Sequence, residues 1–407
     1  MDLKGKYCKD CKVFTDNIDA DALSLIYSFV NHPMFEGSKI RIMPDVHAGR
    51  DIVVGFTVPF ADHVNPDHVG GDIGCTVSTS ITDIPVRKED FVEIEKRIRE
   101  HVVFGMDSQP DIFYNVHEMC SYIAKCHSMA RTVWPDYVGP IDLSERGISK
   151  WLQKIEMDGA TFYRQIGTVG GGNHFVEIGI TPDGNYAMTA HCGSRNLGQK
   201  VWKYWHKIAR NPGMVRVTGY LEEEQMRGYI TDMVVAQAYA SFNHMQIQRL
   251  LLDVLRRVGG RHGGNVLESI ITTHNYIDFR SRIMRKGAVA ALKGEKLVIP
   301  FNMRDGLIVC HGKSNNDWNC SAPHGAGRLI KRGDAKELID LEEFEESMKD
   351  VYSTSVGRGT IDESPMAYKD TDEIIRLIKD TVAVDYFIKP VINLKAMSSV
   401  VTDEEKD

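Results

Sequence analysis

The sequence predicts an α+β fold in which one large domain mixes helices with strands. Segments with helical spacing of apolar residues are interspersed with strand-like segments along all 407 residues. Hydrophobic residues make up 43% of the chain and charged residues 26%, a balance typical of a globular protein with a sizeable core. A chain of this length can hold two or three domains. Because we find no repeats, low-complexity tracts or long linkers, we expect one compact domain over residues 1–395.

The predicted helices are recognised by their spacing and by the charges at their ends. The segment 19–31 opens with an acidic turn and stops before Pro33. The segment 221–258 is the longest, with glutamates at its start and arginines at its end, where both complement the helix dipole. We expect further helices at 88–102, 113–130, 148–157, 335–350 and 371–380.

Several predicted strands have a potential ligand residue at one end. The strand at 39–43 delivers Asp45 and His47, although a turn with an Asx-type hydrogen bond explains this segment equally well. The same pattern recurs with Asp72 and Cys75 before 76–81, His174 before 175–179, His191 after 185–189 and His274 after 270–273. Further strands are expected at 52–60, 297–303, 306–310 and 386–394. Binding sites are commonly built at such strand ends.

The bulk composition argues against several classes of protein. No apolar run approaches the roughly 20 residues of a membrane span and the N-terminus lacks a signal-peptide core, so we expect a cytoplasmic protein without a membrane partner. The formal net charge of -7 argues against nonspecific nucleic-acid binding but leaves room for a local basic face. Eight unevenly spaced cysteines do not resemble a disulfide framework. Residues 396–407 are expected to form a polar, acidic tail.

The stretch from Gly167 to Glu177 combines a flexible backbone with several functional groups. Three consecutive glycines allow the backbone to lie directly against a ligand. An amide, an imidazole, an aromatic ring and a carboxylate follow, at Asn173, His174, Phe175 and Glu177. Taken alone, the stretch fits a plain turn followed by a strand equally well.

Six residues together predict a metal centre. They are Asp72, Cys75, His174, His191, His274 and His324. Mixed oxygen, nitrogen and sulfur donors suit Mn(II), Zn(II) or Co(II) better than Mg(II). The set is large enough for two ions about 3.5–4 Å apart, as in two-metal phosphoryl transfer. His324 differs because small residues surround it and Arg328 follows four positions later, so it is also a candidate covalent nucleophile.

Five blocks of this sequence resemble the signatures of the RtcB family of GTP-dependent RNA ligases. They are Gly-Gly-Asp-Ile-Gly-Cys75, Gly-Gly-Gly-Asn-His-Phe-Val-Glu177, His-Cys-Gly-Ser-Arg195, Thr-His-Asn275 and His-Gly-Ala-Gly-Arg328. They occur in the family order and, with weaker matches such as Asp45 to Gly49 and Glu363 to Lys369, span residues 45–395. The resemblance implies a single mixed α/β domain of the RtcB type, with metal and nucleotide sites at strand ends and glycine-rich loops.

The resemblance also implies a role for each matching residue. Cys75 would bridge two manganese ions, with Asp72 and His174 completing one site and His191 and His274 the other. His324 would attack the α-phosphate of GTP to form a guanylyl-histidine, and Phe175 would stack on the guanine. The remaining nucleotide contacts would come from Asn173, His174, Val176, Glu177, His274, Asn275, Pro300, Asn302, Met303, Gly325, Ala326, Gly327 and Lys395.

The implied reaction joins two RNA ends. GMP is transferred to an RNA 3′-phosphate, and a 5′-hydroxyl then displaces it; a 2′,3′-cyclic phosphate is first opened to the 3′-phosphate. The resemblance leaves room for an accessory activating protein. The chain departs from the family at 300–306, 310–320 and 49–51, which points to a divergent branch acting on damaged RNA instead of tRNA splicing intermediates.

Two other functions fit the same residues. A dinuclear metallo-phosphohydrolase would use the same ligands without a covalent histidine, but the small residues around His324 leave room for a nucleotide and argue against it. An RNA-binding member of the family could have lost ligation. The presence of every metal ligand and of His324 argues against that alternative.

Overall fold

The computed structural model describes residues 1–209, 219–259 and 264–397. Its helices are α1 (Ala20–Val30), α2 (Phe91–His101), α3 (Val116–Val133), α4 (Glu145–Lys154), α5 (Gly159–Arg164), α6 (Arg195–Ala209), α7 (Glu223–Val258), α8 (Arg332–Leu338), α9 (Leu341–Ser347) and α10 (Thr371–Leu377). Side chains that accept hydrogen bonds from first-turn N–H groups fix several helix starts, such as Asp19 before α1 and Asn115 before α3.

The strands are interspersed with these helices, with a long run of described residues from β12 to β18 that contains no α-helix. They are β1 (Asp2–Leu3), β2 (Asp10–Val13), β3 (Lys39–His47), β4 (Val54–Pro59), β5 (His63–Val64), β6 (Thr76–Thr82), β7 (Val103–Phe104), β8 (Thr168–Val169), β9 (Phe175–Ile180), β10 (Tyr186–Cys192), β11 (Leu221–Glu222), β12 (Val266–Thr273), β13 (Tyr276–Asp278), β14 (Ile283–Lys286), β15 (Ala288–Ala290), β16 (Lys296–Asn302), β17 (Gly306–Gly312), β18 (Ser321–Pro323) and β19 (Val382–Leu394).

Two large sheets organise the fold. One has the strand order β1-β2-β3-β4-β14-β13, and the other has the order β12-β6-β10-β9-β19-β17-β16. The second sheet curls until its edge strands meet: Glu268 of β12 pairs with Lys296 of β16 at 2.5 Å, and Thr272 accepts a hydrogen bond from Val298 N at 2.9 Å. The enclosed apolar cluster is Val77, Ile81, Ala187, Ile270, Val298, Leu307, Val309 and Ile388.

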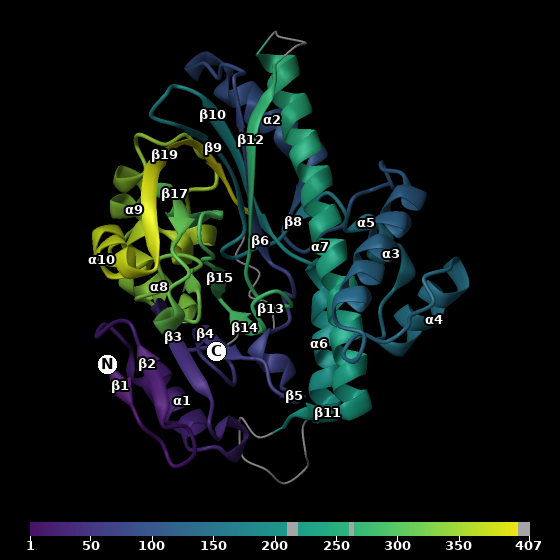
Figure 1. The fold of residues 1–407 in the computed structure, drawn as a ribbon. Helices are drawn as coiled ribbons and strands as arrows, with labels where there is room; N and C mark the ends of the chain where they lie inside the picture. The colour runs from purple at the N-terminus through teal and green to yellow at the C-terminus, as the bar shows by residue number, and fades with distance from the viewer. Residues whose placement is uncertain (210–218, 260–263, 398–407) are drawn as a thin grey trace.

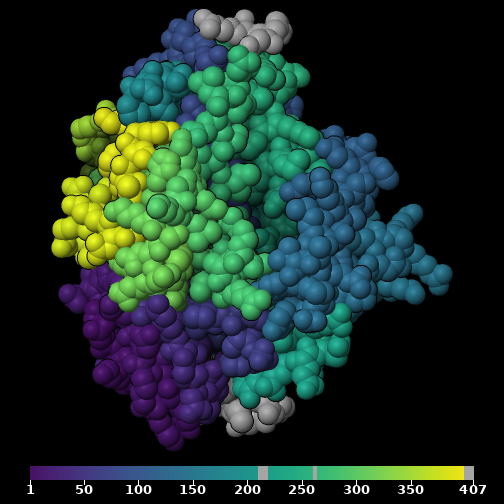
Figure 2. Space-filling model, in the orientation of Figure 1, coloured from purple at the N-terminus to yellow at the C-terminus, as the bar shows by residue number. Residues whose placement is uncertain are grey.

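The long helix α7 joins this sheet to a helical layer. Its C-terminal half packs apolar side chains, such as Ile247 and Leu251, against β9 and β10 together with α2. The same helix also packs against α3 and α6, and it stands between the sheet and the helices α3 to α5 (Figure 1). In the space-filling view, a hollow near the centre lies between the green segment that follows α7 and the blue helices (Figure 2).

One rim of the seven-stranded sheet collects the ends of five strands. His191 of β10 lies opposite Phe175, where β9 begins, and Thr273, where β12 ends, lies opposite Thr76, where β6 begins. Leu394, the last residue of β19, lies opposite Val176. The residues at or just beyond these ends are Cys75, His174, His191, His274 and Lys395. The predicted placement of Cys75, His174, His191 and His274 at strand ends is therefore confirmed.

The structure confirms the α+β prediction and corrects some details. The predicted helix at 335–350 is two helices, because Asp340 breaks the run and accepts hydrogen bonds from the first N–H groups of α9. Helix α6 is a further difference, since the sequence analysis predicted no helix after Arg195. Most of the predicted acidic tail, from residue 398 onward, lies outside the described residues. No helix of the described ranges is both long enough and apolar enough to cross a membrane.

Candidate metal and nucleotide site

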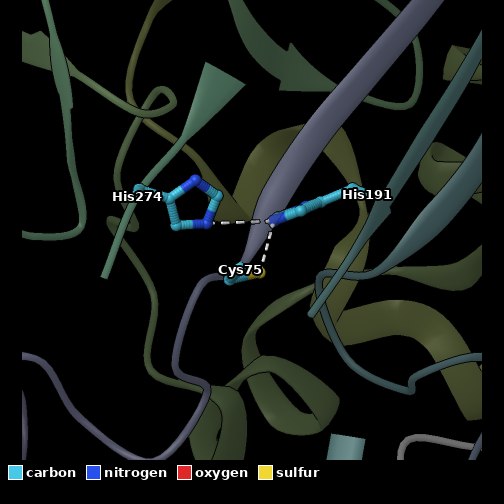
Figure 3. Close-up of side chains that lie close together, drawn as sticks. All are labelled: Cys75, His191 and His274. Atoms are coloured by element: carbon cyan, nitrogen blue, oxygen red, sulfur yellow. Dashed lines mark hydrogen bonds between the residues drawn. The ribbon is translucent and has the colours of Figure 1, made fainter. Parts of the chain in front are cut away.

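The five predicted metal ligands lie close together, with the thiol of Cys75 at their centre. Its Sγ lies 3.4 Å from Nε2 of His174 and 3.3 Å from Nε2 of His191. His191 Nε2 lies 3.2 Å from His274 Nε2, and Figure 3 shows these side chains directed toward one another. On the other side, His174 Nε2 lies 3.0 Å from Asp72 Oδ2. Two groups of three potential ligands therefore share one cysteine: Asp72, Cys75 and His174, and Cys75, His191 and His274.

The protonation states of the histidines and of Asp72 in this cluster favour a bound cation. Burial, together with the charge of neighbouring histidines, lowers the pKa of His191 and His274 well below the usual range, so both rings are neutral. Burial and the nearby Asp72 carboxylate raise the pKa of the Cys75 thiol. Burial also acts to raise the pKa of Asp72, but the hydrogen bond and charge of His174 outweigh it and lower that pKa to about 2.

The donor set fits a pair of borderline divalent ions. Two facing Nε2 atoms at 3.2 Å form a hydrogen bond only if one of them carries a proton, whereas a metal ion satisfies both lone pairs. A dication also stabilises the thiolate form of a cysteine. Glycines make room for the ligands: a Cβ at Gly170 would lie 2.1 Å from His174 Nδ1, and one at Gly193 would lie 2.1 Å from Asp72 Oδ1.

His324 stands beside the metal ligands with one ring nitrogen engaged. Its ring centroid lies 4.7 Å from that of His274. Its Nδ1 lies 2.7 Å from Oδ2 of the fully buried Asp45, which also accepts a hydrogen bond from the backbone N–H of His324 at 3.1 Å. With Nδ1–H donating to the carboxylate, Nε2 keeps its lone pair. Gly327 has a positive φ of 78°, and a Cβ there would lie 2.3 Å from the Asp45 carbonyl oxygen.

Asp45 is a site residue that the sequence analysis left open between a ligand site and a turn. Its partner His324 is 279 positions away, so no local pattern could reveal the pair. The sequence signals were its position at the end of a predicted strand, next to a glycine-containing loop, and the weak resemblance of Asp45 to Gly49 to a family block. In the structure β3 runs to His47, and the ring of His47 bonds back to the Asp45 carbonyl oxygen at 2.9 Å.

The predicted base-binding residues form a second cluster on the same rim. The ring of Phe175 lies 5.6 Å from the ring of His191, nearly at right angles to it, and the Lys395 ammonium lies 5.6 Å from the centre of the same Phe175 ring. Glu177 is 2% exposed and lies two residues after Phe175 on β9, so the two side chains share a face. Burial raises the pKa of Glu177 to about 8, despite the opposing effects of a hydrogen bond from Asn393 and the charge of Lys395.

Glu363 holds Lys395 in place, although the sequence analysis gave it no role. Its Oε2 accepts hydrogen bonds from Lys395 Nζ at 2.8 Å and from the Tyr368 hydroxyl at 2.6 Å. Its Oε1 pairs with Arg328 at 3.2 Å and Arg332 at 2.5 Å. Burial acts to raise the pKa of Glu363, but these three cations outweigh it and hold the pKa well below its usual range. Glu363 is therefore an anion around which three basic residues are fixed.

Some predicted nucleotide residues have other engagements in this structure. The side-chain amide of Asn302 forms hydrogen bonds within the turn that follows it. Its Oδ1 accepts hydrogen bonds from the backbone N–H groups of Arg304 and Asp305, and its Nδ2 donates one to Asp305 Oδ2. Asn275, with a positive φ of 63°, donates to the Asp72 carbonyl oxygen at 3.2 Å and accepts from Gly287 N at 2.7 Å.

The other predicted contacts divide by exposure. The side chains of Val176 and Met303 are buried in apolar clusters. Asn173 is half-buried in the turn before β9. Pro300 lies close to the loop of Gly325 to Gly327, because a Cβ at Gly325 would come within 3.4 Å of the Pro300 carbonyl oxygen.

Comparisons with known proteins agree with this arrangement. Residues 28–396 match the family described as tRNA-splicing ligase RtcB. The RNA-splicing ligase RtcB of Escherichia coli strain K12 is 27% identical over 407 residues, covering 93% of this chain and 95% of that protein. The tRNA-splicing ligases RtcB of Aeropyrum pernix and Methanococcus maripaludis are 25% and 24% identical, covering 83% and 90% of this chain and 83% and 89% of their own lengths.

Proposed function

Because the chain belongs to the RtcB family, we propose that it is an RNA ligase that uses GTP and two Mn(II) ions to join RNA ends. Its substrates would be an RNA 3′-phosphate, or a 2′,3′-cyclic phosphate opened to it, and a 5′-hydroxyl. The observation that carries the proposal is the free Nε2 of His324 beside two ligand groups that share Cys75. Ligase activity is what the names of the relatives describe.

The chain's own residues supply the covalent step. Asp45 holds Nδ1–H of His324, so Nε2 attacks the α-phosphorus of GTP, a P–N bond forms and pyrophosphate leaves. Asp45 also balances the positive charge that develops on the imidazole ring. GMP then passes to the RNA 3′-phosphate, and the 5′-hydroxyl attacks that phosphorus while GMP leaves. Mn(II) ions held by Asp72, Cys75 and His174 and by Cys75, His191 and His274 would polarise the phosphoryl oxygens.

The test is covalent labelling of the wild-type protein. Protein incubated with GTP labelled at its α-phosphate and MnCl₂ is separated on a denaturing gel, and acid-labile label on the protein is expected. Addition of RNA with 3′-phosphate and 5′-hydroxyl ends should release the label as GMP and yield a sealed strand. Phosphate release from RNA ends without any labelled protein would instead support the metallo-phosphohydrolase. Metal binding with neither reaction would support an RNA-binding protein without ligation.

Replacing Asp45 by asparagine is expected to slow formation of the labelled protein roughly a hundredfold. The amide still accepts a hydrogen bond from Nδ1–H of His324 but removes the negative charge that stabilises the reacting ring. The rate of labelling in a single turnover measures this effect. Metal content should stay at the wild-type level because Asp45 lies outside both ligand groups, and an unchanged labelling rate would contradict the proposed role.

Nucleotide affinity is expected to rise with pH up to about 8 because of Glu177. Its pKa is raised to about 8. In the ionised carboxylate both oxygens accept hydrogen bonds from guanine N–H groups, whereas in the protonated form one oxygen carries a proton. Binding must therefore release a proton at lower pH, and affinity for GMP should increase about tenfold per pH unit between pH 6 and 7.5. Calorimetric titrations across this range measure the slope. Glu177→Gln should bind more weakly and without this slope, and a wild-type affinity independent of pH would contradict the assignment.

Three further expectations belong to this proposal. We propose the cytoplasm as the location, a single ligase domain over residues 1–395, and a role in RNA repair or tRNA splicing that an accessory protein could activate. The departures from the family motifs at residues 49–51 and 300–306 favour repair of damaged RNA.

A further inference from the structure

Strands β9 and β19 place two polar side chains side by side at the base-binding end of the sheet. Asn393 lies opposite Glu177 in the strand register, and its Nδ2 donates a hydrogen bond to Glu177 Oε2 at 2.8 Å. Both residues are only 2% exposed. Phe175 and Lys395 lie two residues away from them on the same strands or at their ends, and therefore on the same face.

Each of these two side chains keeps one buried oxygen without a donor. Glu177 Oε1 and Asn393 Oδ1 have no hydrogen-bond partner among the described residues. Lys395 Nζ does not supply one in this structure, and its hydrogen bonds go to Glu363 Oε2 at 2.8 Å and the Gly172 carbonyl oxygen at 3.2 Å. Buried polar atoms without partners are rare in folded proteins and call for an explanation. Two adjacent ones next to an aromatic ring indicate a ligand that brings two adjacent donors.

We propose that Asn393 reads the nucleobase, with its Oδ1 accepting an N–H from the 2-amino group of guanine. This inference rests on the proposed function, in which GTP occupies the cluster of Phe175, Glu177 and Lys395. Guanine carries N1–H and the 2-amino group on one edge, so Glu177 takes N1–H while Asn393 takes the neighbouring amine. Adenine presents an unprotonated N1 on this edge, which the Glu177 carboxylate repels. Hypoxanthine, the base of IMP, keeps N1–H but lacks the amine.

The role assigned to Asn393 differs from that of a residue that only orients Glu177. If Asn393 did no more than hold the carboxylate, its loss would weaken every ligand that carries N1–H. If it also contacts the 2-amino group, its loss weakens guanine more than hypoxanthine and removes the preference between the two bases. GMP and IMP therefore separate the two roles, and neither carries the pyrophosphate leaving group, so binding is measured without reaction.

The experiment titrates GMP and IMP into the full-length protein in MnCl₂ by calorimetry. The wild type should bind GMP about 5–10-fold more tightly than IMP, the value of one hydrogen bond to a neutral acceptor. Asn393→Leu, which keeps the branched shape of the side chain, should bind GMP and IMP equally, because loss of the hydrogen bond to Glu177 weakens both ligands by the same factor and loss of Oδ1 weakens GMP alone. Glu177→Gln is the matched control and should weaken both ligands by the same factor, because both carry N1–H.

The outcomes that overturn the inference are distinct from failure of the proposed function. Equal affinities of the wild-type protein for GMP and IMP would overturn the inference. This measurement needs no variant, so the inference can be tested even if the Asn393→Leu protein misfolds. A GMP preference that survives in Asn393→Leu, or an equal loss for both ligands, would also overturn it. In each case, covalent labelling by GTP would leave the ligase proposal standing. Absence of both labelling and GMP binding in the wild type would remove the ligase proposal and this inference together.

Discussion

Replacing His324 by alanine is expected to abolish covalent labelling by GTP and to lower RNA sealing at least roughly 10³-fold. The reason is that the His324 ring lies beside the ligand groups with Nδ1 held by the Asp45 carboxylate. Its other nitrogen, Nε2, is therefore the atom placed to attack. Alanine removes the atom that forms the P–N bond, so neither added metal nor added nucleotide should restore the label. Quantified acid-labile label per protein chain measures the first effect, and gel analysis of joined RNA measures the second.

The His324 variant should otherwise resemble the wild type. Its side chain belongs to neither group of potential metal ligands, so its manganese content is expected to change little. His311→Ala is a matched control, because that histidine is 38% exposed and pairs with Asp385, away from the predicted ligands. It should keep full labelling. Wild-type label on the His324→Ala protein would show that another residue is the nucleophile and would contradict the proposed mechanism.

Much of the site could be predicted because its residues occupy strand ends and glycine-rich turns. Patterns within ten residues identify such positions, as they did for Cys75, His174, His191 and His274. The same local patterns predicted the long helix α7 and most strands. Local patterns did not predict the start of α6. This helix begins at Arg195 with a positive φ of 58°, a conformation that residues other than glycine rarely adopt and that the sequence does not indicate.

The parts that could not be predicted depend on partners far apart in the chain. Asp45 meets His324 across 279 residues, and Glu363 fixes Lys395 across 32. These contacts exist only after β3, β9 and β19 have taken their places in two sheets, and strand order is not encoded in any single strand. Asn302 illustrates a side chain with a local structural role. A motif position suggested a nucleotide contact, but the side chain is used to close the turn between β16 and β17.

Replacing Cys75 by alanine is expected to remove bound manganese and to lower the labelling and sealing rates at least roughly 10³-fold. Cys75 is the one residue common to both ligand groups, so its loss leaves two ligands on each side. Two ligands do not hold a divalent ion firmly, and the phosphoryl oxygens lose their electrophilic partner. Elemental analysis of the purified protein and its rate of label formation measure the two consequences. Added MnCl₂ should raise the melting temperature of the wild type and leave that of the variant unchanged.

Cys192→Ala separates ligation from packing in this test. Cys192 is also fully buried on the same rim, but its thiol lies 3.1 Å from His244 Nε2 and belongs to neither ligand group. That variant should lose the packing of a buried thiol yet keep both ions and the label. Retention of two ions by Cys75→Ala would contradict the shared-ligand geometry. The His324 and Cys75 variants together show which step depends on which. His324→Ala should bind metal without forming label, whereas Cys75→Ala should do neither. The reason is that nucleotide transfer requires the metal, but metal binding does not require the nucleophile.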